Sequence, residues 1–281
     1  FKAPSVIVWK KHLDGDMSEL IWAPEIHYID KKWYIYFAAA PNKEVTGITF
    51  NHRMYVIECL DADPLTGTWT EKGQIKTGWE SFSLDATILQ HKGKLYYIWA
   101  QEDRNVNYES HSNIYIAEME NPWTLRTKPV MLTQPLLDWE IKIFWVNEGP
   151  AILKKNGKIF LTYSASATDE NYCIGMLVVN ENDDLLDPKS WKKLEKPVFK
   201  TSYKNKQYGP GHNSFTVSED GMKDLLVYHA RNYTDIEGDP LYDPNRHTRV
   251  QVIEWDKDGF PIFGEPVMDT RNVDFDSLRK K

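Results

Sequence analysis

APEIHYIDKKWYIYFAA, at residues 23–39, is the first of four similar stretches that decide the fold. The other three are LDATILQHKGKLYYIWAQ (84–101), NEGPAILKKNGKIFLTYSAS (147–166) and GHNSFTVSEDGMKDLLVYHAR (211–231). Each stretch opens with small or polar residues, runs through an apolar strand, turns at a Gly, Asn, Asp or Lys pair, and returns as an aromatic-rich strand. Two apolar runs of strand length joined by such a turn predict a β-hairpin. The sequence therefore predicts four hairpins.

The hairpins recur at a nearly constant spacing. With Ala23, Asp85, Glu148 and His212 as equivalent starting points, successive units lie 62, 63 and 64 residues apart. A weaker strand pair follows each hairpin, within residues 54–75, 113–132, 172–199 and 249–267. Four antiparallel strands in a radially repeated unit are typical of a β-propeller blade. A solenoid is the competing repeat architecture, but no window shows the sustained helical period that most solenoids require.

The start of the chain does not follow the repeat. FKAPSVIVWKK, at residues 1–11, is typical of the closing edge strand of a blade, yet no inner hairpin precedes it. A ring of four units and a fraction would leave an unpaired strand edge, which is an aggregation hazard. We therefore expect an all-β, five-bladed β-propeller whose first blade has its inner strands upstream of this chain.

The whole chain, 1–281, is expected to be one propeller domain. The expected blade boundaries are a remnant of blade 1 at 1–11, then blades 2 to 5 at about 20–76, 82–133, 145–200 and 208–270.

Composition narrows the class of partner. The chain has 34 Lys and Arg against 41 Asp and Glu, a formal net charge of −7, and no basic stripe. Nucleic acid is therefore not an expected partner. No apolar run approaches the 18 to 20 residues of a membrane span, and residues 1–30 show no signal-peptide pattern. Cytoplasmic and secreted locations both stay open.

Metal and phosphate chemistry have little support in the sequence. Cys59 and Cys173 each lie inside an apolar strand of a different unit, where buried thiols are expected. We find no zinc-binding spacing and no Gly-rich phosphate loop. No cofactor is expected to be required.

The inner strands open with unexpected titratable residues. Asp85, Glu148 and His212 stand at these openings, which should converge at one end of the propeller axis. Two converging carboxyl groups suit cleavage of a glycosidic bond, in which one protonates the leaving oxygen and another activates water. The alternative is that the two acidic residues satisfy backbone donors at strand starts, which is common for Asp but not for Glu.

Aromatic residues stand beside these positions. Trp22, Phe82 and Trp145 could form apolar walls on which the C–H face of a sugar stacks. The alternative is that each belongs to the core, as Trp in a propeller strand usually does.

Four short segments carry a resemblance to a known family. WAPE (22–25), SLDAT (83–87), NEGP (147–150) and YGPGHNSF (208–215) resemble glycoside hydrolase family 43, the inverting five-bladed propeller enzymes that act on arabinan and xylan. YSASAT (163–168) and DPNRHTR (243–249) are similar to its α-L-arabinofuranosidase branch, including exo-acting enzymes on α-1,5-arabinan. These segments occur in order at blade spacing over essentially the whole chain.

The resemblance implies a role for each carboxylate. Glu148 matches the family's general acid, and Asp85 matches the aspartate that orients this acid and raises its pKa. The family's general base is an aspartate in the opening strand of the first blade, which is expected upstream of this chain. Asp14 and Asp16 are early acidic residues, but they follow an edge strand and are poor candidates. The chain alone is therefore expected to be inactive.

The resemblance also implies ligand contacts. His212 resembles the axial histidine that faces a bound ion or a water cluster in many relatives, so a calcium or sodium ion held through waters is expected, unless the ring is merely hydrogen-bonded. Arg246 or Arg249 matches the arginine that reaches sugar hydroxyls. Arg246 is preferred because it lies at the mouth of its strand, whereas Arg249 could be a ladder residue, and a surface role for either stays open.

The expected function is release of L-arabinofuranose from arabinan or arabinoxylan of plant cell walls by single-step inversion. A β-xylosidase or an endo-arabinanase on the same scaffold is the alternative within enzymes, because fold does not decide substrate. A non-catalytic carbohydrate-binding propeller is the alternative from another class, and a protein-interaction propeller is a third.

Overall fold

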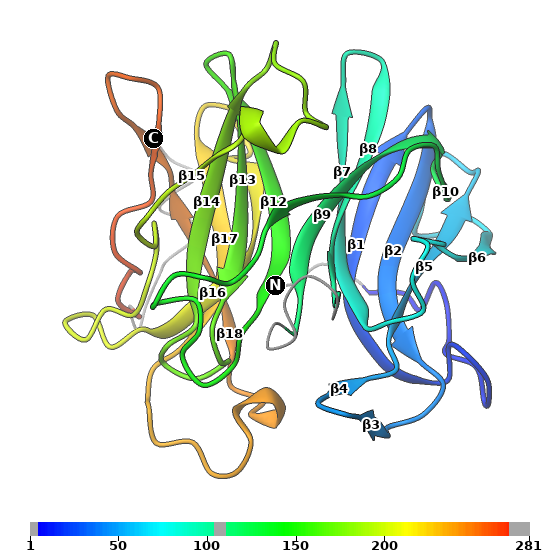
Figure 1. The fold of residues 1–281 in the computed structure, drawn as a ribbon, viewed down its shortest axis with the longest axis horizontal. Helices are drawn as coiled ribbons and strands as arrows, with labels where there is room; N and C mark the ends of the chain where they lie inside the picture. Colours follow the sequence, from blue (N-terminus) through cyan, green and yellow to red (C-terminus); the bar gives the residue numbers. More distant parts are fainter. Residues whose placement is uncertain (1–4, 104–110, 270–281) are drawn as a thin grey trace.

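A computed structural model describes residues 5–103 and 111–269 of the chain. Residues 1–4 of the expected blade 1 remnant, residues 104–110 of blade 3 and residue 270 of blade 5 lie outside the described residues. Four antiparallel sheets make up most of the described structure (Figure 1). The predicted all-β, propeller-like architecture is confirmed with four sheets.

Each sheet begins with the strand of one predicted hairpin. The first sheet has the order β1 (Glu19–Ile29), β2 (Lys32–Ala40), β5 (Arg53–Cys59), β6 (Trp69–Gln74). The second has β7 (Ser83–His91), β8 (Lys94–Gln101), β9 (Asn113–Asn121), β10 (Thr124–Leu125), and β11 (Val130–Thr133) also pairs with β9. The third has β12 (Asn147–Lys155), β13 (Lys158–Ala165), β14 (Cys173–Asn180), β15 (Lys192–Lys193).

The fourth sheet has three strands in the described chain, where four were predicted. They are β16 (Tyr208–Val217), β17 (Asp224–Arg231) and β18 (His247–Val252). In the described residues no fourth strand pairs with β18, and the Gln251 side-chain amide donates to the carbonyl oxygens of Phe263 and Glu265.

Short elements lie between and beside the sheets. Two small hairpins are β3 (Val45–Thr46) with β4 (Thr49–Phe50), and β19 (Glu254–Trp255) with β20 (Pro261–Ile262). The 3-10 helices are η1 (Pro188–Ser190) and η2 (Pro240–Tyr242). None of the helices within the described ranges has the length and hydropathy to cross a membrane.

The turns explain why the hairpins could be predicted. Asp30-Lys31, Lys92-Gly93 and Asn156-Gly157 each place two successive residues at positive φ. Two positive φ values are the requirement of a type I′ turn, whose twist matches that of the strands it joins. The signal is local, so it is visible in the sequence.

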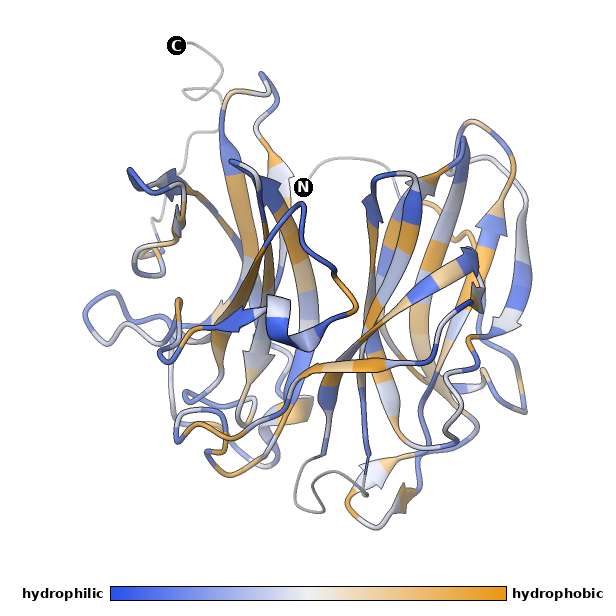
Figure 2. Cartoon of the chain, turned by 45° about the horizontal axis from the view of Figure 1, so that its top comes forward, coloured by the Kyte–Doolittle hydropathy of each residue, from blue (hydrophilic) through white to orange (hydrophobic). Residues whose placement is uncertain are grey.

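The four inner strands lie side by side in chain order. β1 packs beside β7, β7 beside β12, and β12 beside β16. Figure 2 shows apolar segments along the strands and polar segments in many of the connecting loops. One apolar cluster joins the first three sheets, and a second joins the third sheet to the fourth. Each sheet therefore packs against the next through apolar side chains, and the inner strands of neighbouring sheets are adjacent.

The first and fourth sheets each keep an exposed apolar face. Ile26 of β1 is 50% exposed and Val250 of β18 is 45% exposed, whereas β7, between two sheets, is buried almost throughout. Residues 5–11 form no strand pairing, but Trp9 packs on Phe37 of the first sheet at 4.9 Å between ring centroids. The N-terminal segment therefore covers only part of the open face of the first sheet.

Truncation of a core side chain in the third sheet should destabilise the protein strongly. Leu161 is fully buried opposite Leu177 of β14. Leu161→Ala should lower the free energy of unfolding by about 2–5 kcal/mol, measured by urea denaturation, because it leaves a cavity in a packed core. Leu65→Ala, at an exposed position, is the control and should change it by less than about 0.5 kcal/mol. Equal losses in the two variants would contradict the packing described here.

Candidate active site

Every inner strand opens with the same backbone irregularity. One extra residue interrupts the pairing after Trp22, Leu84, Glu148 and Gly211. The next residue has positive φ in each case, at Ala23, Asp85, Gly149 and His212. Such a bulge bends the strand and redirects a side chain, and it is common beside active sites.

This irregularity corrects the repeat alignment by one residue. The sequence alignment treated Asp85 and Glu148 as equivalent, but Asp85 occupies the bulge itself and Glu148 precedes it. The residue equivalent to Asp85 is Gly149, where φ is +55° and an added Cβ would lie 3.3 Å from His212 Cγ. A glycine tolerates this conformation and permits the close approach of the His212 ring.

Asp85 is joined to its neighbours across two sheet boundaries. Its Oδ2 accepts a hydrogen bond of 3.0 Å from the Gly149 N–H of the third sheet. The same oxygen lies 3.9 Å from His212 Nδ1 of the fourth sheet. Asp85 is 5% exposed, and burial is the main cause of its raised pKa.

The pKa of Glu148 is raised well above that of an ordinary glutamate. Burial is the first cause that raises it, the negative charge of Asp85 is the second, and the result is a pKa of about 7. The Tyr172 hydroxyl donates a hydrogen bond of 2.6 Å to Glu148 Oε1, which lowers the pKa in part. A carboxyl with this pKa is mostly protonated below neutral pH and about half ionised at neutral pH, so it can release its proton there.

The two carboxyl groups lie in a cleft of about 890 Å³. It is lined by residues from the first, second, third and fourth sheets and by the loop between β17 and β18. Of the predicted site residues, the cleft brings together Trp22, Asp85, Glu148, His212 and Arg246. This group contains two carboxyl groups, a cation and an aromatic side chain, which are groups that can bind a sugar.

Three predicted residues are not brought to the cleft. Phe82 is 9% exposed and packs in the core. Trp145 is partly buried before β12, and its carbonyl oxygen accepts a hydrogen bond from the His111 amide. Arg249 lies in the β17–β18 ladder, where its guanidinium donates to Ala230 O and His247 O and pairs with Asp269. The ladder alternative for Arg249 therefore describes its position.

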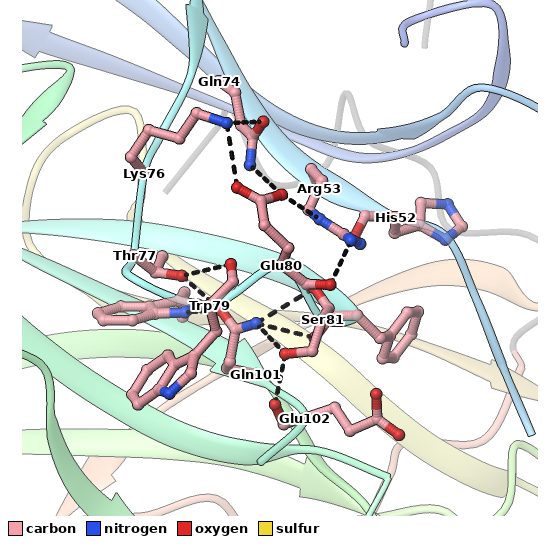
Figure 3. A network of polar contacts seen from close by, with 12 residues as sticks. His52, Arg53, Gln74, Lys76, Thr77, Trp79, Glu80, Ser81, Gln101 and Glu102 are labelled. Atoms are coloured by element: carbon pink, nitrogen blue, oxygen red, sulfur yellow. Dashed lines mark hydrogen bonds and ion pairs between the residues drawn. The ribbon is translucent and has the colours of Figure 1, made fainter. Parts of the chain in front are cut away.

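Phe82 stands behind the wall of the cleft. The His52 ring packs on Trp22 at 4.1 Å between ring centroids and on Phe82 at 5.7 Å. A polar network holds the backbone at residues 81–82, since the Gln101 amide donates to Ser81 Oγ at 2.7 Å and to Phe82 O at 3.3 Å (Figure 3). Phe82 thus supports Trp22 through His52 and does not face the cavity.

Sequence reasoning missed two aromatic residues of the site. Tyr172 contacts Glu148 directly, and its ring stacks on His229 of β17 at 5.5 Å between centroids. His229 lines the cleft, and burial holds the pKa of its imidazole well below the usual range. Tyr172 lies just before β14 and His229 lies within β17, and no local pattern distinguishes either residue.

A second cavity, of about 740 Å³, follows the inner strands. His212 borders both cavities, and Asn213, 4% exposed, has a side-chain amide with no hydrogen-bond partner among the described residues. Within residues 5–103 and 111–269, no group of three or more His, Cys, Asp or Glu side chains is arranged to hold a metal ion. An ion beside His212 would therefore need water or other oxygen ligands.

The pKa of Glu148 should respond in opposite directions to two substitutions. Asp85→Asn removes a negative charge and should lower this pKa below about 7. Tyr172→Phe removes a hydrogen bond to the ionised form and should raise it. The measurement is a ¹³C NMR titration of labelled glutamate carboxyl groups, with Glu148→Gln to assign the signal. Shifts of the same sign, or no shift in either variant, would contradict the geometry of the pair.

Comparisons with known proteins relate most of the chain to a family of enzymes. Residues 2–261 match glycosyl hydrolases family 43. The chain is 56% identical over 267 residues to an extracellular exo-α-(1→5)-L-arabinofuranosidase of Streptomyces avermitilis and 50% identical over 267 residues to α-L-arabinofuranosidase 43 of Humicola insolens. Each alignment covers 95% of this chain and 54% of the relative, so the chain spans about half the length of these two proteins.

A solved structure gives the same assignment. The crystal structure of an α-L-arabinofuranosidase from Lactobacillus brevis superposes with a TM-score of 0.92 at 62% identity, covering 94% of this chain and 82% of that one. A thermostable family-43 glycoside hydrolase superposes with a TM-score of 0.72 at 26% identity, covering 90% of this chain and 77% of that one. This chain belongs to family 43 of the glycosyl hydrolases.

Proposed function

We propose that the full-length protein is an inverting α-L-arabinofuranosidase that releases L-arabinofuranose from α-1,5-arabinan or arabino-oligosaccharides. The observation that carries the proposal is the pair of Asp85, which is buried, and Glu148, which is partly buried, two carboxyl groups with raised pKa values in one cleft. The similarity to relatives named as arabinofuranosidases supports arabinose as the sugar.

Glu148 acts as the general acid in this proposal. Its protonated carboxyl donates to the glycosidic oxygen as the bond to the anomeric carbon breaks. A pKa of about 7 keeps the group protonated at the start of the reaction without making it too weak an acid. Asp85, held by the Gly149 N–H, orients the region around the acid and raises its pKa.

The general base is an aspartate on a fifth sheet that is not part of the chain described here. The exposed apolar faces of the first and fourth sheets support this part of the proposal, because a further sheet would bury Ile26 and Val250. Such a sheet would lie next to β1, whose residues Trp22 and Ala23 line the cleft. An inverting mechanism needs the base about 6.5–9.5 Å from Glu148, which leaves room for water.

Two side chains would recognise the sugar. Trp22 offers an aromatic face for the C–H face of the ring. Arg246 carries a cation with several donors for the hydroxyl groups. A calcium or sodium ion bound beside His212 through waters is part of the same proposal, and the unpartnered Asn213 amide is consistent with a polar occupant of the second cavity.

Loss of the proposed acid should depend on the leaving group. Glu148→Gln in the full-length protein should abolish cleavage of arabinan but spare much of the activity on aryl arabinosides, whose leaving groups need little protonation. Kinetics on the two substrates measure this difference. Glu181→Gln, at a partly exposed position in the turn after β14 and outside the cleft lining, is the control and should leave both activities unchanged. Equal losses on both substrates would argue against the acid role.

The first products should be single sugars of inverted configuration. Proton NMR of a fresh digest of linear arabino-oligosaccharides should show β-L-arabinofuranose before mutarotation, because inversion of an α linkage gives the β anomer. Early α anomer would show retention. Oligomeric products would indicate an endo-arabinanase, and turnover of xylo-oligosaccharides in place of arabinan would indicate a β-xylosidase. Calorimetric binding without turnover would indicate a carbohydrate-binding propeller.

A further inference from the structure

The loop between β17 and β18 supplies the only arginine that lines the cleft in the described chain. Residues 232–246 form this loop, which contains one turn of 3-10 helix, η2, and few buried side chains. Its cleft-lining residues are Leu241, Tyr242, Asp243, Pro244 and Arg246. A long loop needs specific contacts to hold one of its side chains in a fixed position, because ordering the loop costs conformational entropy.

A buried arginine provides the first set of hydrogen bonds that hold the loop. Arg231, the last residue of β17, is 1% exposed. Its guanidinium donates to Thr168 O at 2.5 Å, to Pro240 O at 2.6 Å and to Asp243 Oδ1 at 3.1 Å. A buried guanidinium is costly unless it is paired and its donors are satisfied, and here each of its three nitrogens donates a hydrogen bond.

Asp243 closes the loop on itself. The Tyr233 hydroxyl, from the start of the loop, lies 2.7 Å from Oδ2 and 2.9 Å from Oδ1 of Asp243, near its end. The Asn245 N–H donates to Oδ1 at 2.9 Å. The Tyr233 hydrogen bond, the largest cause, lowers the pKa of Asp243, so this carboxyl is ionised opposite Arg231 at neutral pH. We call Arg231, Tyr233 and Asp243 the loop clamp.

The loop clamp stands directly before Arg246. Arg246 follows Asp243 by three residues, and its Nη2 donates to Leu241 O at 3.2 Å within the same loop. Thr168 also lines the cleft and belongs to the segment after β13 of the third sheet. The clamp therefore fixes the loop to two sheets at once, on the side where Glu148 lies.

We propose that the loop clamp positions Arg246 for the hydroxyl groups of the bound sugar, so that Arg231, Tyr233 and Asp243 set substrate affinity without carrying out the chemistry. The inference deepens the proposed function and rests on it for the identity of the sugar. It also gives a role to the YSASAT and DPNRHTR segments, which supply Thr168 and Asp243.

The charge of Arg246 supplies an independent readout. Among the groups facing Glu148, Asp85 raises its pKa, whereas Tyr172, His212 and Arg246 lower it. If the clamp is weakened and Arg246 moves away, the pKa of Glu148 should rise while the other three groups stay in place. A purely structural role of the clamp would not change this pKa.

The test is a double-mutant cycle in the full-length protein. Tyr233→Phe keeps the ring and removes the hydroxyl bound to Asp243. It should raise KM for arabino-oligosaccharides about 5-fold, the equivalent of one hydrogen bond, with little change in kcat. The alkaline limb of the kcat/KM profile should move to higher pH. In an Arg246→Met background the same substitution should have no further effect on KM or on the limb, because the two residues act as a unit.

Tyr34→Phe is the matched control. The buried Tyr34 hydroxyl donates to Glu58 Oε1 at 2.7 Å in the first sheet, so this variant also loses one tyrosine-to-carboxylate hydrogen bond. It should lower stability without changing KM. Should Tyr233→Phe not fold, Asp243→Asn, which keeps the shape and loses the charge, is the second variant, with the same expected changes. Additive effects in the Arg246→Met background, or a loss of stability with unchanged KM and pH profile, would overturn the inference.

Failure of the proposed function would be visible separately. If the wild-type protein cleaves xylo-oligosaccharides and not arabinan, the proposed sugar is wrong, and the same cycle on the xylose substrate still tests the clamp. If no substrate is cleaved, the clamp can still be tested by ¹³C NMR titration of the Glu148 carboxyl group. A rise of its pKa in Tyr233→Phe but not in Tyr34→Phe supports the clamp, and no rise in either variant refutes it.

Discussion

One hydrogen bond lies at the centre of the arrangement described here, from the Gly149 N–H to the Asp85 carboxylate. It joins the second and third sheets where their inner strands begin, and it requires the bulges at both residues. Because a glycine occupies the bulge of the third sheet, the His212 ring of the fourth sheet can approach to within contact distance. Three sheets thus meet at one buried carboxylate, and the position of Glu148 follows from that meeting.

Burial then determines the chemistry of the pair. A buried carboxyl group and a partly buried one in the same cleft do not ionise as independent groups, so protons are retained to higher pH than in solution. Tyr172 favours the ionised form of Glu148 and Asp85 disfavours it. The balance gives a pKa of about 7, close to the pH at which a proton donor is most useful. Site geometry and site electrostatics therefore have a common origin in the packing of the sheets.

The periphery of the site combines a strand residue with a loop residue. Trp22 belongs to β1 and is supported by His52 and Phe82, which lie just before β5 and β7, and Arg246 belongs to a loop held by a buried arginine. The two carboxyl groups thus stand on strands that follow the repeat, whereas Arg246 stands on a loop, as is common when polar residues of a cleft lie on loops of a rigid scaffold.

The sequence by itself determined the hairpins, the sheet order and the positions of Asp85 and Glu148, because turn residues and alternation are local and the repeat marks where each inner strand begins. It misaligned Glu148 by one residue, since a bulge is a matter of pairing register that the sequence does not display. Only the tertiary structure decided which distant side chains meet. Tyr172 reaches Glu148, Arg231 joins Thr168 to Asp243, and Phe82 supports the wall from behind, because contacts between different sheets and loops leave no periodic trace along the chain.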